Sequence, residues 1–131
     1  MKLSEPKTKK DFEKYYELRW RILRAPWNQP LDSEKDNLED KSIHIMCTDK
    51  TDILGVGRAH FNSKDEAQIR YMAVDENQQG NGVGSKILQE LEKRVQEKGA
   101  KYIVLNSRGS AVNFYKKQGY EIISEAPTMF G

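Results

Sequence analysis

The sequence has almost no cysteine and no long apolar run. Cys47 is the single cysteine in 131 residues, so no internal disulfide can form, which fits a reducing compartment. We interpret Cys47 as a packing residue of a strand. No apolar stretch approaches the ~18 residues that a membrane span requires, and the amino-terminal residues contain no secretory apolar segment. We therefore expect a cytoplasmic protein that does not enter a membrane.

The sequence also lacks an excess of charge of either sign. Its 22 lysine and arginine residues are balanced by 20 acidic residues, which gives a formal net charge of +2, and the two signs are mixed along the chain. This pattern does not indicate a nucleic-acid-binding surface. A length of 131 residues with 37% hydrophobic residues predicts one globular domain over residues 1–131. We expect no metal site.

The spacing of apolar residues predicts both helices and strands. Apolar positions three or four apart indicate helices, whereas alternation or β-rich runs indicate strands. The predicted helices cover residues 9–24, a short segment after Asp32, 83–98 and 110–118. The predicted strands cover residues 42–49, 53–61, 67–74, 101–106 and 120–124. The fold class is therefore α/β in mixed order.

Local signals refine this order of elements. Thr8 and Asp11 form a capping-box pattern before the first helix, and Pro26 should end that helix. The first three strands are joined by short polar turns and should be antiparallel. The strand, helix and strand that follow form a crossover unit, which should be parallel. Gly55 and Gly57 within a strand predict a bulge or a close approach of another element.

A glycine-rich loop lies where the third predicted strand leads into the longest apolar-periodic helix. Gly80, Gly82 and Gly84 alternate at the point where this helix begins, so its first N–H groups carry little side-chain bulk. Such N–H groups can bind a phosphate or a pyrophosphate. The dinucleotide fingerprint would require glycine where Ser85 stands, and no Gly-Lys-Ser/Thr run completes a Walker A loop. Both of those nucleotide-binding patterns are excluded.

Three motifs around this loop resemble those of the GNAT-type N-acetyltransferase superfamily. Residues 79–84, Gln-Gly-Asn-Gly-Val-Gly, match its pyrophosphate-binding signature. Residues 71–74 and 111–120 match two further family motifs in the expected order. Within the superfamily, residues 18–27, 68–74 and 105–108 are similar to a small uncharacterised bacterial and archaeal group. The resemblance covers almost the whole chain and implies a central mixed sheet with helices on both faces.

The resemblance implies that acetyl-coenzyme A is the acetyl donor, with no metal. Its pantetheine arm would pair with a strand edge, and its pyrophosphate would bind the glycine loop. Backbone N–H groups near Met72 or Ala73 would stabilise an oxyanion. The expected cofactor-binding residues are Met72, Ala73, Val74, Gln79, Gly80, Asn81, Gly82, Val83, Gly84, Asn106 and Phe114.

The resemblance also implies that an acceptor amine attacks the thioester directly in a ternary complex. Tyr115 stands where the family commonly holds the acid that protonates the leaving thiolate, and the alternative role is that of a core aromatic residue beside Phe114. The amine must lose a proton before it attacks. Gln68 stands where some members hold a glutamate, and an amide cannot act as a base. The base is left open among His60, His44, Glu66 and a water chain.

The sequence leaves the acceptor open as a small-molecule or peptide amine. Arg70 lies in the middle of a predicted strand, where it should either pair with a carboxylate or bind an anionic group of the acceptor. Trp27 is either a wall of the pocket or a hydrophobic plug. The alternative function is a non-catalytic coenzyme A-binding regulatory or adaptor module, which the missing glutamate would permit.

The end of the chain raises one further expectation. Members of the superfamily usually continue into one more strand, whereas this sequence ends at Gly131 soon after the strand predicted at 120–124. The open hypotheses are a shortened chain, disordered residues that follow, and a homodimer in which a second subunit pairs with this edge.

Overall fold

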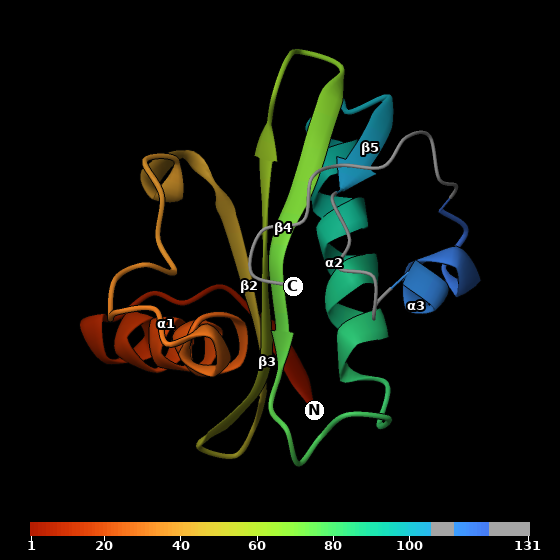
Figure 1. Ribbon diagram of the computed structural model, residues 1–131. Helices are drawn as coiled ribbons and strands as arrows, with labels where there is room; N and C mark the ends of the chain where they lie inside the picture. Colours follow the sequence, from red (N-terminus) through yellow and green to blue (C-terminus); the bar gives the residue numbers. More distant parts are fainter. Residues whose placement is uncertain (106–111, 121–131) are drawn as a thin grey trace.

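A mixed sheet separates two helical layers in the computed structural model, which describes residues 1–105 and 112–120 (Figure 1). Helix α1 (Lys9–Leu23) covers one face of the sheet, and helices α2 (Val83–Glu97) and α3 (Val112–Lys117) lie on the other side. In this part of the chain the strands are β1 (Lys2–Ser4), β2 (Ile43–Asp49), β3 (Asp52–Phe61), β4 (Glu66–Val74) and β5 (Tyr102–Leu105).

The sheet has the predicted change from antiparallel to parallel pairing. Its order is β1-β2-β3-β4-β5, in which β1 to β4 pair antiparallel and β4 pairs parallel with β5 across the α2 crossover. The expected fold class, with helices on both faces, is confirmed. Strand β1 was not predicted, because three residues are too few to show a period. It pairs with the outer edge of β2.

Helix α1 begins and ends where the sequence indicates. The side chain of Thr8 accepts a hydrogen bond from the Asp11 N–H at 3.0 Å, and the Asp11 carboxylate accepts from the Thr8 N–H at 3.2 Å. This reciprocal pair satisfies two N–H groups that lack helical partners. The helix ends at Leu23, and a single turn of 3-10 helix, η1 (Ala25–Trp27), carries the chain past Pro26.

The expected short helix after Asp32 is wrong. The structure has turns there and one turn of 3-10 helix, η2 (Glu39–Lys41). The Asp36 carboxylate accepts a hydrogen bond from the Leu38 N–H at 2.9 Å, and the Glu39 carboxylate accepts from the Asp36 N–H at 3.0 Å. These local bonds satisfy the backbone in a compact loop, which competes with helix formation.

Each face of the sheet carries its own apolar cluster. The cluster under α2 contains Ile45, Cys47, Leu54, Ala59, Ala67, Ile69, Val83, Ile87, Leu88, Leu91 and Val95. The cluster under α1 contains Tyr15, Leu18, Leu23, Met46, Val56 and Ala73. Neighbouring residues of β2 therefore separate to opposite faces as the alternation predicts. Cys47 is fully buried, in agreement with its interpretation as a packing residue.

The structure shows both features that the strand glycines predict, a close approach of another element and a bulge. A Cβ atom on Gly55 would lie 2.7 Å from Val83 Cγ1, and one on Gly57 would lie 2.7 Å from Ile87 Cγ2. Helix α2 therefore packs directly on the β3 backbone. The register between β3 and β4 also shifts around Gly57, which marks a bulge.

The last elements are placed only in part. Helix α3 confirms the short helix expected from residues 110–118. The strand predicted at 120–124 falls almost entirely outside the described residues, as do Asn106 and the edge proposed for a homodimer. In the described ranges, every helix is too short or too polar to cross a membrane.

Candidate active site

The parallel pairing of β4 with β5 stops before β4 ends. The paired residues run from Glu66 with Tyr102 to Ile69 with Leu105. Within residues 1–105 and 112–120, residues 70–74 have no partner on this side. Their backbone N–H and C=O groups can pair with an extended ligand. The predicted residues Met72, Ala73 and Val74 belong to this segment.

A bulge in β4 lies at the start of the same segment. Val56 pairs with Ala73 and Arg58 pairs with Arg70, so two β4 residues oppose the single Gly57 of β3. One of these two residues is Tyr71, which has a φ of 59°. This left-handed conformation is unfavourable for a bulky side chain and is concentrated at functional sites. The extra residue of a bulge is left out of the hydrogen-bond ladder, so the regular pairing of β4 with β3 is interrupted at this point.

The glycine loop leaves its backbone open at the start of α2. Gly80 and Gly82 have φ values of 89° and 82°, and a Cβ atom on either would meet no atom within 4 Å. Gly82 is the N-cap of α2 and has no side chain to accept from the first-turn N–H groups. The open space and the uncapped helix start form a cradle for an anion.

Helix α3 packs against this first turn of α2. A Cβ atom on Gly84 would lie 3.3 Å from Phe114 Cζ, so a larger residue would press on the Phe114 ring. The Gln118 amide donates to the Ser85 hydroxyl at 3.2 Å. The half-buried Tyr115 stacks edge-on against Phe114, with ring centroids 5.0 Å apart. The structure thus brings Phe114 beside Gly84 of the glycine loop, and Tyr115 packs against Phe114 and Tyr120.

Helix α1 is tied to the beginning of the loop by Arg21. Its Nη2 atom lies 3.1 Å from Asp75 Oδ2, and its Nη1 atom lies 3.1 Å from Glu76 Oε1. Asp75 also accepts from the Asn77 N–H at 2.8 Å. These contacts fix the chain where it leaves β4. Sequence reasoning missed Arg21, since its partners lie more than fifty residues away and no local motif marks them.

The face of the sheet under α1 carries a buried ion network. Arg58 Nη1 lies 2.6 Å from Asp36 Oδ1 and 2.8 Å from Glu39 Oε2, and Arg19 Nη1 lies 3.0 Å from Glu39 Oε1. Both arginine side chains are fully buried. Burial alone would raise the pKa of Asp36, but hydrogen bonds from Arg58 and from the Leu38 N–H hold that pKa well below its usual value. The network therefore stays ionised at neutral pH.

His60 belongs to this network and has no open nitrogen. Because a guanidinium group can only donate, His60 Nδ1 accepts from Arg58 Nη2 at 3.0 Å, and Nε2 donates to Asn62 Oδ1 at 3.0 Å. Burial and the charge of Arg58 lower the pKa of His60. Asn62 also donates to Glu66 and Gln68, at 2.7 and 3.0 Å. Asn62 therefore contacts His60, Glu66 and Gln68, three residues at or near the positions considered for deprotonating the amine.

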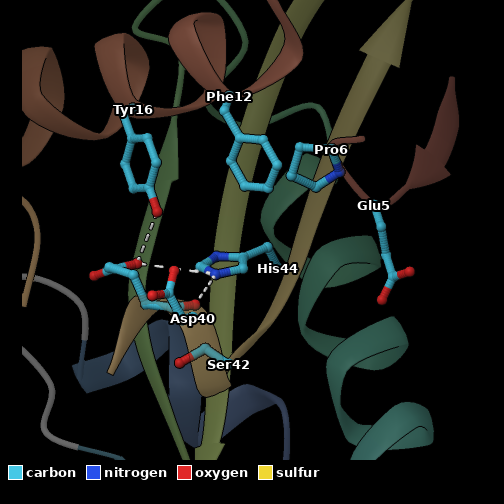
Figure 2. A pocket seen from close by; sticks show the side chains of 8 residues that line it. Glu5, Pro6, Phe12, Tyr16, Asp40, Ser42 and His44 are labelled. Atoms are coloured by element: carbon cyan, nitrogen blue, oxygen red, sulfur yellow. Dashed lines mark hydrogen bonds and ion pairs between the residues drawn. The ribbon is translucent and has the colours of Figure 1, made fainter. Parts of the chain in front are cut away.

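His44 lies in a different place, two strands from β4. Its Nε2 donates to the Glu39 carbonyl at 2.7 Å, and its Nδ1 lies 2.9 Å from the Tyr15 hydroxyl. Figure 2 shows Phe12 and Tyr16 reaching from α1 towards this imidazole. The surrounding pocket has a volume of about 310 Å³ and is lined by Glu5, Pro6, Phe12, Tyr16, Glu39, Asp40, Ser42 and His44. With strands about 4.8 Å apart, His44 is too distant to serve the β4 edge directly.

The comparisons with known proteins agree with this geometry. Residues 12–120 match the model of the acetyltransferase (GNAT) family. The chain is 32% identical over 126 residues to the uncharacterized N-acetyltransferase YjcF of Bacillus subtilis (strain 168), and the alignment covers 95% of this chain and 89% of that protein. The chain therefore belongs to the GNAT acetyltransferase family, and the resemblance seen in its motifs is confirmed.

Solved structures share the fold at low sequence identity. Escherichia coli ElaA has a TM-score of 0.84 at 16% identity, with coverage of 99% of this chain and 94% of that chain. An aminoglycoside 6'-N-acetyltransferase complexed with coenzyme A has a TM-score of 0.80 at 19% identity, with coverage of 95% and 87%. These similarities establish the architecture.

Proposed function

We propose that this protein transfers an acetyl group from acetyl-coenzyme A to a primary amine of a small-molecule or peptide acceptor, by direct attack in a ternary complex. The observation that carries the proposal is the open glycine cradle at Gly80 and Gly82, which directly follows a strand edge without a β5 partner in the described residues. Family membership supports the acetyl-transfer chemistry.

The residues around the cradle fit coenzyme A. The first-turn N–H groups of α2 would hold the pyrophosphate, with Gln79, Asn81 and Val83 completing the loop. The edge of β4 from Met72 to Val74 would hydrogen-bond the pantetheine amides, each bond contributing about 0.5–1.5 kcal/mol. Asn106 and Phe114 complete the proposed set. Bound acetyl-coenzyme A supplies an activated thioester.

The bulge would stabilise negative charge on the reacting carbonyl oxygen. Amide groups at Met72 or Ala73 lie next to the residue with positive φ, outside regular pairing with β5. Fixed N–H groups aimed at a developing oxyanion need no reorganisation during the reaction, which is why such sites lower barriers. Both residues keep this proposed role.

Tyr115 would protonate the departing thiolate. The proposal is supported by its neighbours: Phe114, against which Tyr115 packs, contacts Gly84, and Gln118 donates to Ser85. A hydroxyl group placed there can donate a proton to a sulfur atom that leaves along the β4 edge.

The group that deprotonates the amine is inferred by excluding candidates. Gln68 cannot accept a proton, His60 has both ring nitrogens engaged, and His44 lies two strands away. Glu66 already accepts from Asn62 and lies six residues before Met72 on β4, about 20 Å along the strand. A water chain is therefore the favoured candidate among the four. The second candidate function is a coenzyme A-binding module without turnover. It is favoured by Gln68, which stands where some family members hold a glutamate.

A turnover assay with a panel of amines tests the proposal. We expect thiol release from acetyl-coenzyme A with at least one acceptor, and we expect Tyr115→Phe to lower kcat about 100-fold, the lower range for loss of a general acid. Calorimetry should show unchanged acetyl-coenzyme A affinity in the variant. Tight binding without thiol release on any acceptor, and with no effect of Tyr115→Phe, would instead identify the binding module.

A further inference from the structure

Positive charge exceeds negative charge around the ring of Tyr71, on the α1 side of the bulge. Four guanidinium carbons lie near the ring centroid: those of Arg19, Arg58 and Arg70 at 4.5, 4.7 and 4.6 Å, and that of Arg24 at 5.7 Å. Arg19, Arg58 and Arg70 pair with one shared group of carboxylates. Their carboxylate partners in the described residues are two, Asp36 and Glu39. One of the three cations therefore lacks a full counter-charge.

The contacts show which cation this is. Arg58 donates to both oxygens of Asp36, at 2.6 and 3.0 Å, and shares Glu39 with Arg19. Arg70 reaches Asp36 Oδ2 at only 3.5 Å, and that oxygen already accepts from Arg58 Nη2. Arg19 and Arg58 are fully buried, whereas the Arg70 side chain is 40% exposed. The uncompensated charge thus lies on Arg70, and solvent can reach it.

Arg70 is placed beside the proposed reaction centre by the fold itself. It follows Ile69, the last residue of β4 that pairs with β5, and it directly precedes the bulge. The bulge turns Arg70 and Tyr71 to the same side, because Arg70 contacts Asp36 while Tyr71 packs with the cluster under α1. The partly exposed Arg70 guanidinium therefore lies next to the bulge on the α1 side.

We propose that the acceptor carries an anionic group, a carboxylate or a phosphate ester, and that Arg70 binds this group while the amine lies at the bulge. A guanidinium group offers five donors in a planar fork that matches both oxyanions. The Tyr71 ring, 4.6 Å from the Arg70 guanidinium carbon, supports the side chain by cation–π contact. This inference rests on the proposed acetyl transfer and specifies its acceptor.

Matched pairs of amines test the inference. The phosphate arm compares O-phosphoethanolamine with ethanolamine, and the carboxylate arm compares β-alanine with β-alaninamide. Binding to the coenzyme A-saturated protein is measured by calorimetry, and kcat/KM by thiol release. We expect the anionic member of at least one pair to be favoured 10-fold or more, and the arm that responds identifies the anion.

Variants then assign the preference to Arg70. Arg70→Gln should raise KM or Kd for the anionic amine about 10-fold more than for its neutral partner, with a larger effect on KM than on kcat. Arg94→Gln is the matched control. It removes one equally charged, partly exposed side chain on α2 that pairs with Glu90 and Glu5. It should change KM and Kd for neither amine of a matched pair. Thermal melting checks that both variants fold.

The outcomes separate this inference from the proposed function. Equal or weaker use of the anionic member in both arms overturns the inference, as does failure of all four amines to bind while acetyl-coenzyme A binds normally. An equal loss for both members in Arg70→Gln also overturns it. If acetyl-coenzyme A itself does not bind to the wild-type protein, the proposed function fails and the inference fails with it.

Discussion

The two faces of the sheet are built on different principles. The face under α2 is apolar, and the helix packs so closely that only glycine fits at positions 55 and 57 of β3. The face under α1 combines an apolar patch with a buried ion network that reaches the β4 bulge. One face fixes the sheet and the start of the glycine loop, and the other presents charge to the proposed acceptor side. Both faces therefore contribute to stability, and the face under α1 also brings charge to the β4 bulge.

The largest effect should come from breaking the ion network. Arg58→Ala leaves Asp36 and Glu39 without their shared buried partner, which should lower the free energy of unfolding by about 3–5 kcal/mol. Urea denaturation measures the loss. Arg94→Ala, which removes a partly exposed ion pair on α2, should cost less than about 1 kcal/mol. Equal small losses in the two variants would show that the network is not a structural element.

A smaller loss should follow from overpacking the opposite face. Gly57→Ala places a Cβ atom 2.7 Å from Ile87 Cγ2 and from Met72 Sδ, so α2 or the β4 edge must move. We expect a destabilisation of about 1–3 kcal/mol in the same assay. Since Met72 belongs to the proposed pantetheine edge, acetyl-coenzyme A affinity should fall too. An unchanged midpoint would mean that the close packing of α2 on β3 is not required.

The smallest expected effect is a dependence of stability on pH, which arises from the face under α1. Burial lowers the pKa values of both His44 and His60, which lie on the α1 side. The unfolded chain binds protons at about pH 6.5, where the folded protein does not, so stability should decrease as the pH falls from about 7 to 5. Urea midpoints at these two pH values test this, and His60→Gln should weaken the dependence. Stability that rises towards pH 5 would contradict the assignment.

The sequence predicts the face under α2 much better than the face under α1. Helix α2, its strands and the glycine loop all follow from local periodicity or from a contiguous motif. The partners of Arg58, by contrast, come from a loop that has no period, and the helix expected there does not form. Asp36 and Glu39 are separated from Arg58 by 22 and 19 residues, so only the tertiary structure brings them together.

The candidate site shows the same division. Gly80 and Gly82 were identified from their spacing alone, and the structure gives both the left-handed backbone that the loop requires. The glycines in β3 predict the bulge, whereas its strained residue, Tyr71, lies in β4, where the motif at residues 71–74 does not reveal its positive φ. The surplus charge on Arg70 follows from contact distances, which a sequence does not contain.

A calorimetric titration with acetyl-coenzyme A tests the central claim most directly. Gly82→Val and Gly99→Val each place a β-branched residue at positive φ, at the start and just beyond the end of α2, where open space surrounds both positions. Both should lose about 1–3 kcal/mol of stability. We expect only Gly82→Val to lose acetyl-coenzyme A binding, by 10-fold or more, because its side chain covers the cradle. Equal affinity in the wild-type protein and both variants would contradict the claim.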